Sequence, residues 1–245
     1  MTDYYYKYLK YKIKYLKLLE NVKSVDNSSN ETIMDNENIN KLVGGNSNTI
    51  IHISGPSGAG KTTLGNKLKY KFDDKIVVMD LDILRYDFVK KEYGGFSKFK
   101  FNKNDKFDKN KYQKWIDDYI NKQTKPIVFV GLNHMPWWHK DFYYNMHAKY
   151  NFYIKIDTDT VFKQKCNRFI EQTFIENKDR MFNNIKKNEN DTIKFVSNVY
   201  KHECSYNEVK KLNEMWNRDY KKQKYVFMSR EKIYGRVCDI LEAIL

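Results

Sequence analysis

Residues 55–63 have the types and spacing of a loop that binds phosphate groups. The loop consists of Gly55, Pro56, Ser57, Gly58, Ala59, Gly60, Lys61, Thr62 and Thr63. It fits the pattern G-x-x-x-x-G-K-[ST], in which glycines let the backbone curl until successive N–H groups face a phosphate. The start of the following helix adds the positive end of its dipole. We therefore predict that the whole loop binds a nucleotide, with Lys61 reaching the β- and γ-phosphates and Thr62 binding Mg²⁺.

A second group of reactive side chains, Asp80, Asp82 and Arg85, follows the next apolar run, "KIVVMD". Adjacent parallel strands end at the same edge of a sheet, so these side chains are expected to face the loop. If the strand extends to Asp82, both aspartates share one face. One could then hold Mg²⁺ through water while the other accepts the proton of an attacking hydroxyl. Arg85 could grip an anionic acceptor with both arms of its guanidinium. The alternative is that Asp82 caps a helix and Arg85 is a surface charge.

Apolar runs alternate with helical patterns from Thr49 onward, which predicts an α/β fold with a parallel sheet flanked by helices. Strands are expected at 49–54, 75–79, 126–131, 151–156 and 225–229. Helices are expected at 61–72, 81–92, 107–122, 138–148, 159–176, 205–222 and 230–244, with a polar, basic excursion at 177–198. The glycine loop thus falls between a strand and a helix, as its motif requires.

Two further segments, 1–22 and 23–48, precede this domain. In 1–22 apolar residues recur at steps of four and three while lysines fall on another face, which predicts an amphipathic basic helix. Such a helix could dock on the domain, self-associate or lie on an anionic surface. Residues 23–48 are rich in Asn, Ser, Asp and Glu and predict a flexible linker. The folded domain is therefore expected over 49–245.

The charge, the apolar runs and the cysteines of the chain limit the classes of function that fit it. The chain has 245 residues and a net charge of +14, so nucleic acid is a possible partner, although a solvated lysine surface fits the charge equally well. No apolar run approaches the roughly 20 residues of a transmembrane segment, and no signal-peptide pattern is present. We expect a soluble, intracellular protein. The three cysteines lack metal-site spacing, so no zinc site is indicated.

Taken together, the glycine loop and the pattern D-x-D-x-x-R at residues 80–85 resemble those of P-loop kinases. The similar families are adenylylsulfate kinase, polynucleotide 5′-kinase and the zeta-toxin-like kinases. The resemblance implies a P-loop NTPase three-layer sandwich with sheet order 2-3-1-4-5, which acts on ATP with Mg²⁺ and an anionic acceptor. It implies Lys61 and Asp82 as catalytic residues, with Asp82 as the base. It further implies Arg85 as a clamp on the acceptor's phosphate and Asp80 as an aid to Mg²⁺.

Weaker matches to the same kinases add three residues. "KPIVFVGLNHM" looks like their third strand, which often ends in a polar residue near the phosphates, and Asn133 is the candidate for a substrate contact. Arg168 and Arg180 could supply a cationic lid over the transferring phosphoryl group, and Arg180 is the candidate catalytic arginine. The alternative is that both arginines are merely solvated.

Other resemblances are more limited. "YYYKYLKYKIKYLKLL" followed by Gly44-Gly45 resembles an N-terminal element of many giant DNA virus proteins, which speaks to origin, and hence to a host cytoplasm or virion, and not to activity. A GTPase is disfavoured because no glycine follows an aspartate by three residues. A nucleoside or nucleotide (monophosphate) kinase remains one alternative. A non-catalytic nucleic-acid-binding or virion protein with a nucleotide-binding loop is the alternative of another class.

Overall fold

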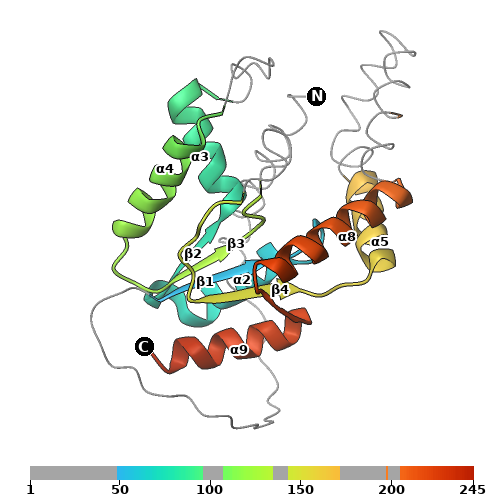
Figure 1. Cartoon of the computed structure of the whole chain (residues 1–245). Coiled ribbons are helices and arrows are strands. Elements are labelled where there is room, and N and C mark those ends of the chain that lie inside the picture. Colours follow the sequence, from blue (N-terminus) through green and yellow to red (C-terminus); the bar gives the residue numbers. More distant parts are fainter. Residues whose placement is uncertain (1–48, 96–106, 135–142, 172–196, 198–204) are drawn as a thin grey trace.

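A computed structural model describes residues 49–95, 107–134, 143–171, 197 and 205–245. The helix predicted over 1–22 and the linker predicted over 23–48 lie outside these residues. The described part is an α/β fold built on a five-stranded, all-parallel sheet with the order β2-β3-β1-β4-β5 (Figure 1). The predicted α/β class, the parallel sheet and its strand order are therefore confirmed.

Strands and helices alternate along most of the described chain. The strands are β1 Ile50–Ser54, β2 Val77–Asp80, β3 Ile127–Val130, β4 Tyr150–Ile154 and β5 Val226–Met228. The helices are α2 Lys61–Phe72, α3 Leu81–Tyr93, α4 Lys109–Asn121, α5 Thr158–Ile170, α8 Tyr206–Lys222 and α9 Arg230–Glu242. A short 3-10 turn, Asp73–Lys75, connects α2 to β2.

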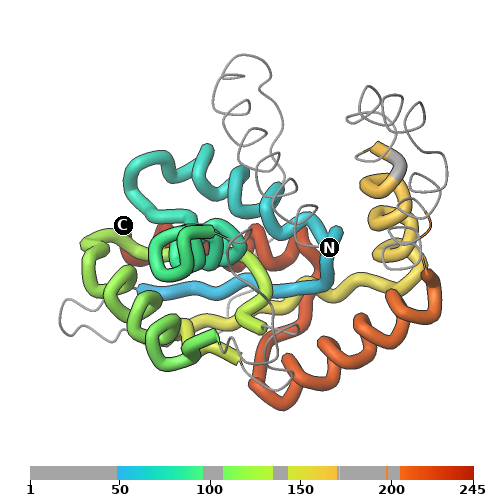
Figure 2. Tube along the Cα trace, turned by 90° about the horizontal axis from the view of Figure 1, so that it is seen from above, coloured from blue at the N-terminus to red at the C-terminus, as the bar shows by residue number. Residues whose placement is uncertain are grey.

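Helices cover both faces of the sheet, which gives three layers (Figures 1 and 2). Helices α2 and α9 pack on one face. Their shared core includes Ile51, Ile53, Leu64, Leu68, Val128, Val237 and Leu241. Helices α3 and α4 pack on the other face through Leu84, Phe88, Tyr112, Ile127 and Phe129. On that same face α8 covers β4, where Trp216 and Tyr220 pack against Tyr153.

The central strand β1 explains why the sheet forms where it does. Its sequence, IIHIS, is dominated by β-branched residues, and every residue in it is buried. A parallel strand covered on both faces is typically such a continuous apolar run. The strand lies between β3 and β4, so its carboxyl end, where the glycine loop begins, is surrounded by the ends of neighbouring strands.

Four helices begin at a residue whose side chain accepts hydrogen bonds from backbone N–H groups of the first turn. These residues are Asp80 for α3, Asp108 for α4, Asp157 for α5 and Ser229 for α9. Asp and Ser are favoured at this position because a short side-chain oxygen reaches those groups. The helix starts therefore follow from local sequence.

The predicted helix over 138–148 is wrong for the part that the structure describes. Residues 143–148 are not helical. The backbone N–H of His147 donates to Asn145 Oδ1, and that of Asn145 donates to Gln113 Oε1. Such side-chain bonds to the backbone compete with helix formation. Helix α5 was predicted to reach residue 176, and the structure describes it only as far as Ile170.

Candidate active site

The glycine loop connects β1 to α2 and leaves the start of that helix open. Gly58 and Gly60 have φ angles of 90° and 79°, in the left-handed region that glycine adopts without steric cost. Gly60 occupies the N-cap position of α2 and has no side chain that could cap the helix. A helix start of this kind suits an anion, which can accept hydrogen bonds from the first N–H groups.

Lys61, the first residue of α2, folds back across the loop. Its Nζ donates hydrogen bonds to the carbonyl oxygens of Gly55 at 2.8 Å and Pro56 at 2.7 Å. The ammonium group therefore lies inside the curve of the loop and not in open solvent. A positive charge held there can neutralise phosphate oxygens that enter the same curve.

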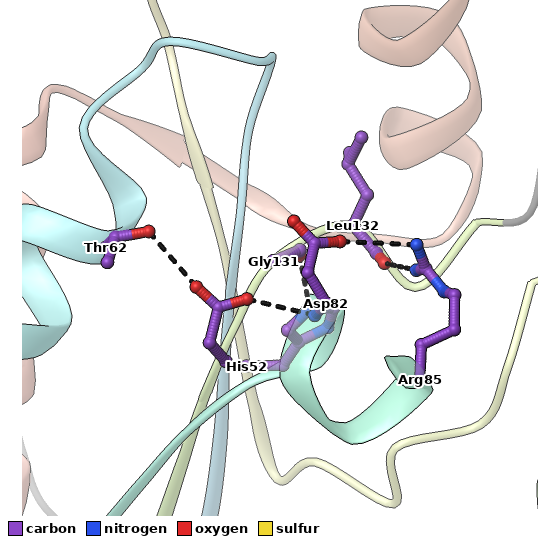
Figure 3. Close-up of polar contacts among 7 residues, drawn as sticks. His52, Thr62, Asp82, Arg85, Gly131 and Leu132 are labelled. Atoms are coloured by element: carbon purple, nitrogen blue, oxygen red, sulfur yellow. Dashed lines mark hydrogen bonds and ion pairs between the residues drawn. The ribbon is translucent and has the colours of Figure 1, made fainter. Parts of the chain in front are cut away.

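Asp80, at the end of β2, joins two helix starts through its carboxylate. Oδ2 accepts a hydrogen bond of 3.1 Å from the Thr62 hydroxyl, and Oδ1 accepts one of 2.9 Å from the backbone N–H of Asp82 (Figure 3). Asp80 is buried, and a buried carboxylate needs such partners. The structure thus brings the second reactive group next to the glycine loop.

Strand β2 ends at Asp80, so the condition under which both aspartates would share one strand face is not met. Helix α3 already begins at Leu81, because the Asp80 side chain caps it there. The alternative made Asp82 the helix cap. In the structure Asp80 is the cap of α3, and Asp82 lies in the first turn of that helix. Asp82 nevertheless lies near Gly131 and Leu132, at the start of the segment that follows β3 (Figure 3).

Arg85 is buried, which excludes the alternative that it is a surface charge. Its Nη1 donates to Asp82 Oδ1 at 3.2 Å, and its Nη2 donates to the carbonyl oxygen of Leu132 at 3.1 Å. The guanidinium therefore bridges α3 and the segment that follows β3 (Figure 3). Its predicted contact with an acceptor phosphate is not among these bonds and stays a prediction.

His52, in the middle of β1, lies beneath this arrangement. Its Nε2 is 3.0 Å from the carbonyl oxygen of Gly131, and its Nδ1 is 2.6 Å from the Tyr225 hydroxyl. A carbonyl can only accept, so Nε2 carries the proton and Tyr225 donates to Nδ1. Burial lowers the pKa of His52 to about 4, against the opposing effect of the bond to Gly131 and with a smaller contribution from the charge of Lys61. The imidazole is therefore neutral at pH 7.

Asn133, the candidate at the end of the third strand, is buried and held at both ends of its amide. Nδ2 donates to the carbonyl oxygen of Tyr144 at 2.9 Å, and Oδ1 accepts from the Tyr220 hydroxyl at 2.7 Å. These bonds connect the segment after β3 to residue 144 and to α8. Its contact with substrate stays a prediction.

Arginines from α5 and α9 flank the glycine loop. Arg168 Nη2 donates to Ser57 Oγ at 2.9 Å, so this candidate is brought to the loop. A Cβ at Gly60 would lie 2.7 Å from Nη1 of Arg230, which places the Arg230 guanidinium against the loop as well. Arg180, the other lid candidate, lies outside the described residues.

Sequence reasoning missed His52 and Arg230. The signal for Arg230 was available, because only Ser229 separates it from the end of β5 and parallel strands end at the same edge. His52 gave a weaker signal, since a histidine within an apolar strand is compatible with many partners.

The oxygens of Thr62 and Asp80 fit Mg²⁺. This ion prefers oxygen ligands and is usually held by one or two protein groups together with phosphates and water. One hydroxyl and one carboxylate lie 3.1 Å apart beside the open end of α2. Both belong to the residues that the sequence assigns to the metal.

No protein-family model matches the chain, and a search of the curated proteins finds no match either. Within the described ranges, no helix is both long enough and apolar enough to cross a bilayer.

Proposed function

We propose that this chain is an ATP-dependent phosphotransferase of the P-loop kinase type, which moves the γ-phosphoryl group of ATP to an acceptor. The observation that carries the proposal is the pair of hydrogen bonds that join Thr62, Asp80 and Asp82 beside the glycine loop. A phosphate-binding loop alone would suit any nucleotide-binding protein. The Asp82 carboxylate, next to this loop, adds a group that can accept a proton from a hydroxyl.

The proposed reaction assigns one task to each side chain. The acceptor hydroxyl oxygen forms a bond to the γ-phosphorus, the bond from that phosphorus to the β–γ bridging oxygen breaks, and ADP leaves. Asp82 accepts the hydroxyl proton. Lys61 and the N–H groups at the start of α2 stabilise the negative charge on the phosphoryl oxygens. Thr62 and Asp80 would hold Mg²⁺, which neutralises phosphate charge when bound.

The acceptor defines two versions of the proposal. In the first it is a hydroxyl or phosphate of a small molecule, a nucleotide or a polynucleotide 5′ end, and the resemblance to adenylylsulfate and polynucleotide kinases favours a hydroxyl. In the second it is a nucleoside or a nucleotide. The net charge of +14 would suit the anionic acceptors among these, such as a nucleotide or a polynucleotide. The resemblance of the N-terminal stretch to giant DNA virus proteins adds a proposed viral origin.

A labelling assay tests the proposal. The full chain is incubated with Mg²⁺ and ATP labelled at the γ-phosphate, together with separate pools of nucleosides, nucleotides and 5′-hydroxyl oligonucleotides. We expect label in one pool, and labelling slower by roughly 10²-fold or more with Lys61→Ala. The matched control is Lys67→Ala, which removes an exposed lysine from the same helix. Release of labelled phosphate without a labelled acceptor would indicate a plain ATPase. Binding of nucleic acid without any ATP turnover would support the non-catalytic alternative.

A further inference from the structure

We infer that Arg85 is a positioning residue that holds the Asp82 carboxylate in place, and that it does not grip the acceptor. This inference rests on the proposed function, because it concerns the same site. It departs from the role that the kinase resemblance implies for this arginine.

The first argument is the direction of the guanidinium. Its two terminal nitrogens address two different protein oxygens, Asp82 Oδ1 at 3.2 Å and the Leu132 carbonyl at 3.1 Å. A two-armed grip on an acceptor phosphate uses the same terminal nitrogens. Each terminal nitrogen carries two N–H groups, one of which is committed to a protein oxygen, so these bonds fix the plane in which any grip on an acceptor would have to be made.

The second argument is burial. The side chain of Arg85 is 6% exposed, whereas that of Asp82 is 26% exposed. An acceptor that approaches from solvent therefore meets the carboxylate more readily than the guanidinium behind it. A buried arginine that is bonded to a partly exposed carboxylate restricts the rotamers of that carboxylate, which is the role of a supporting residue in a catalytic site.

The third argument is that the far end of the bridge is itself fixed. Leu132 follows Gly131, whose carbonyl oxygen accepts a hydrogen bond from His52 Nε2 at 3.0 Å. His52 belongs to β1, the strand that leads into the glycine loop. A continuous set of bonds thus runs from β1 through residues 131 and 132 to Arg85 and Asp82 (Figure 3). It relates the position of the proposed base to the strand that positions the phosphate loop.

The two possible roles of Arg85 predict changes in different kinetic constants when the residue is replaced. If Arg85 orients Asp82, its loss lowers kcat and leaves the KM for the acceptor nearly unchanged. If Arg85 grips the acceptor, its loss chiefly raises that KM. The two roles also differ in their dependence on the acceptor, because a grip needs an anionic group and a positioning role does not.

The experiment uses the full chain and the acceptor found by the labelling assay, with variants Arg85→Gln and Arg85→Lys in the wild-type and Asp82→Asn backgrounds. We expect Arg85→Gln to lower kcat roughly tenfold or more and to change the acceptor KM by less than about threefold. In the Asp82→Asn background it should lower kcat no further, because residues that act through one another are not additive. Lys90→Gln, on the exposed side of α3, is the matched control.

If Arg85→Gln does not fold, Arg85→Lys tests the same role. The ammonium keeps the charge but cannot bridge two separate oxygens as a planar guanidinium does. We expect it to lower kcat by the same factor for an acceptor with an anionic group and for one without. A raised acceptor KM at unchanged kcat, a loss confined to anionic acceptors, or losses that multiply in the double variant would overturn the positioning role alone. A wild-type chain that labels no acceptor would overturn the proposed function and this inference with it.

Discussion

The Thr62 hydroxyl donates a hydrogen bond of 3.1 Å to Asp80 Oδ2. This bond joins the first turn of α2 to the end of β2, and the other oxygen of the same carboxylate caps α3. Asp80 therefore caps α3, and in the proposed function it has a second, separable role, which is to hold Mg²⁺ together with Thr62. Substitutions that keep one role and remove the other distinguish them.

Asp80→Asn should preserve the cap and weaken the metal site. Asn caps helices about as well as Asp, so the free energy of unfolding should fall by less than about 1 kcal/mol, mainly through the lost charge at the helix N-terminus. Asp80→Ala should cost about 1 kcal/mol more, because it removes the cap. Both variants should need a higher Mg²⁺ concentration for half-maximal phosphoryl transfer. Urea unfolding and a Mg²⁺ titration measure the two effects, and an unchanged titration for Asp80→Asn would remove this residue from the metal site.

Lys61→Ala should lower kcat for phosphoryl transfer roughly 10²- to 10³-fold, as expected when a preorganised charge that stabilises the transition state is lost. The fold should persist, since alanine is a good helix former and the Lys61 Nζ bonds to the carbonyls of Gly55 and Pro56 lie within the loop itself. Steady-state kinetics and circular dichroism measure the two outcomes. Near-normal turnover would exclude the glycine loop from the chemistry.

Asp82→Asn should lower kcat on the order of 10²-fold, because the amide cannot accept the hydroxyl proton. ATP affinity should change little, since the substitution leaves the glycine loop intact. The matched control is Asp87→Asn, which alters an exposed aspartate of the same helix and should leave kcat near the wild-type value. If Asp82→Asn instead weakens ATP binding at normal kcat, the base lies elsewhere.

The buried His52 should make the fold sensitive to mild acid. Its pKa is lowered from 6.5 to about 4, so between these values the unfolded chain binds a proton that the folded chain does not. The stabilisation is fully present above pH 6.5 and is lost as the pH falls toward 4. Between pH 7.5 and 5 this one group should reduce the free energy of unfolding by about 2 kcal/mol.

Urea unfolding at both pH values measures the effect of His52. His52→Gln keeps hydrogen-bonding groups and removes the titration, so it should lose less stability on acidification than the wild type does. Equal losses in the two proteins would assign the acid sensitivity to other groups.

Much of the fold could be predicted from the sequence because its signals are local. The alternation of β-branched runs with helical patterns gave the order of elements, and the aspartates before α4 and α5 mark helix starts by short-range hydrogen bonds. The helix expected at 138–148 was wrong over 143–148, because the backbone there bonds to Gln113, which is distant in the sequence. No pattern within the segment reports such a contact.

The candidate site was predicted less completely, for a related reason. Thr62 and Asp80 were assigned to the same site because both follow strand ends, a rule that needs only the topology. The contacts of Arg85 depend on the Leu132 carbonyl, a backbone group whose position no residue type reveals. The same holds for His52, whose partners Gly131 and Tyr225 come from two later parts of the chain.

The central place of β1 has a consequence for how the protein is made. The glycine loop leaves the ribosome early, but the strand that supports it pairs with β3 and β4, which end at Val130 and Ile154. Until those strands emerge, the nascent chain exposes Ile51 and Ile53, and pairing across such long separations is slow. Chains arrested on the ribosome before Tyr150 should therefore be digested quickly by added protease and bind chaperones. Chains arrested through a tether that is added after Leu245 and is long enough to place all five strands outside the exit tunnel should resist digestion and, if the proposed function holds, begin to retain ATP.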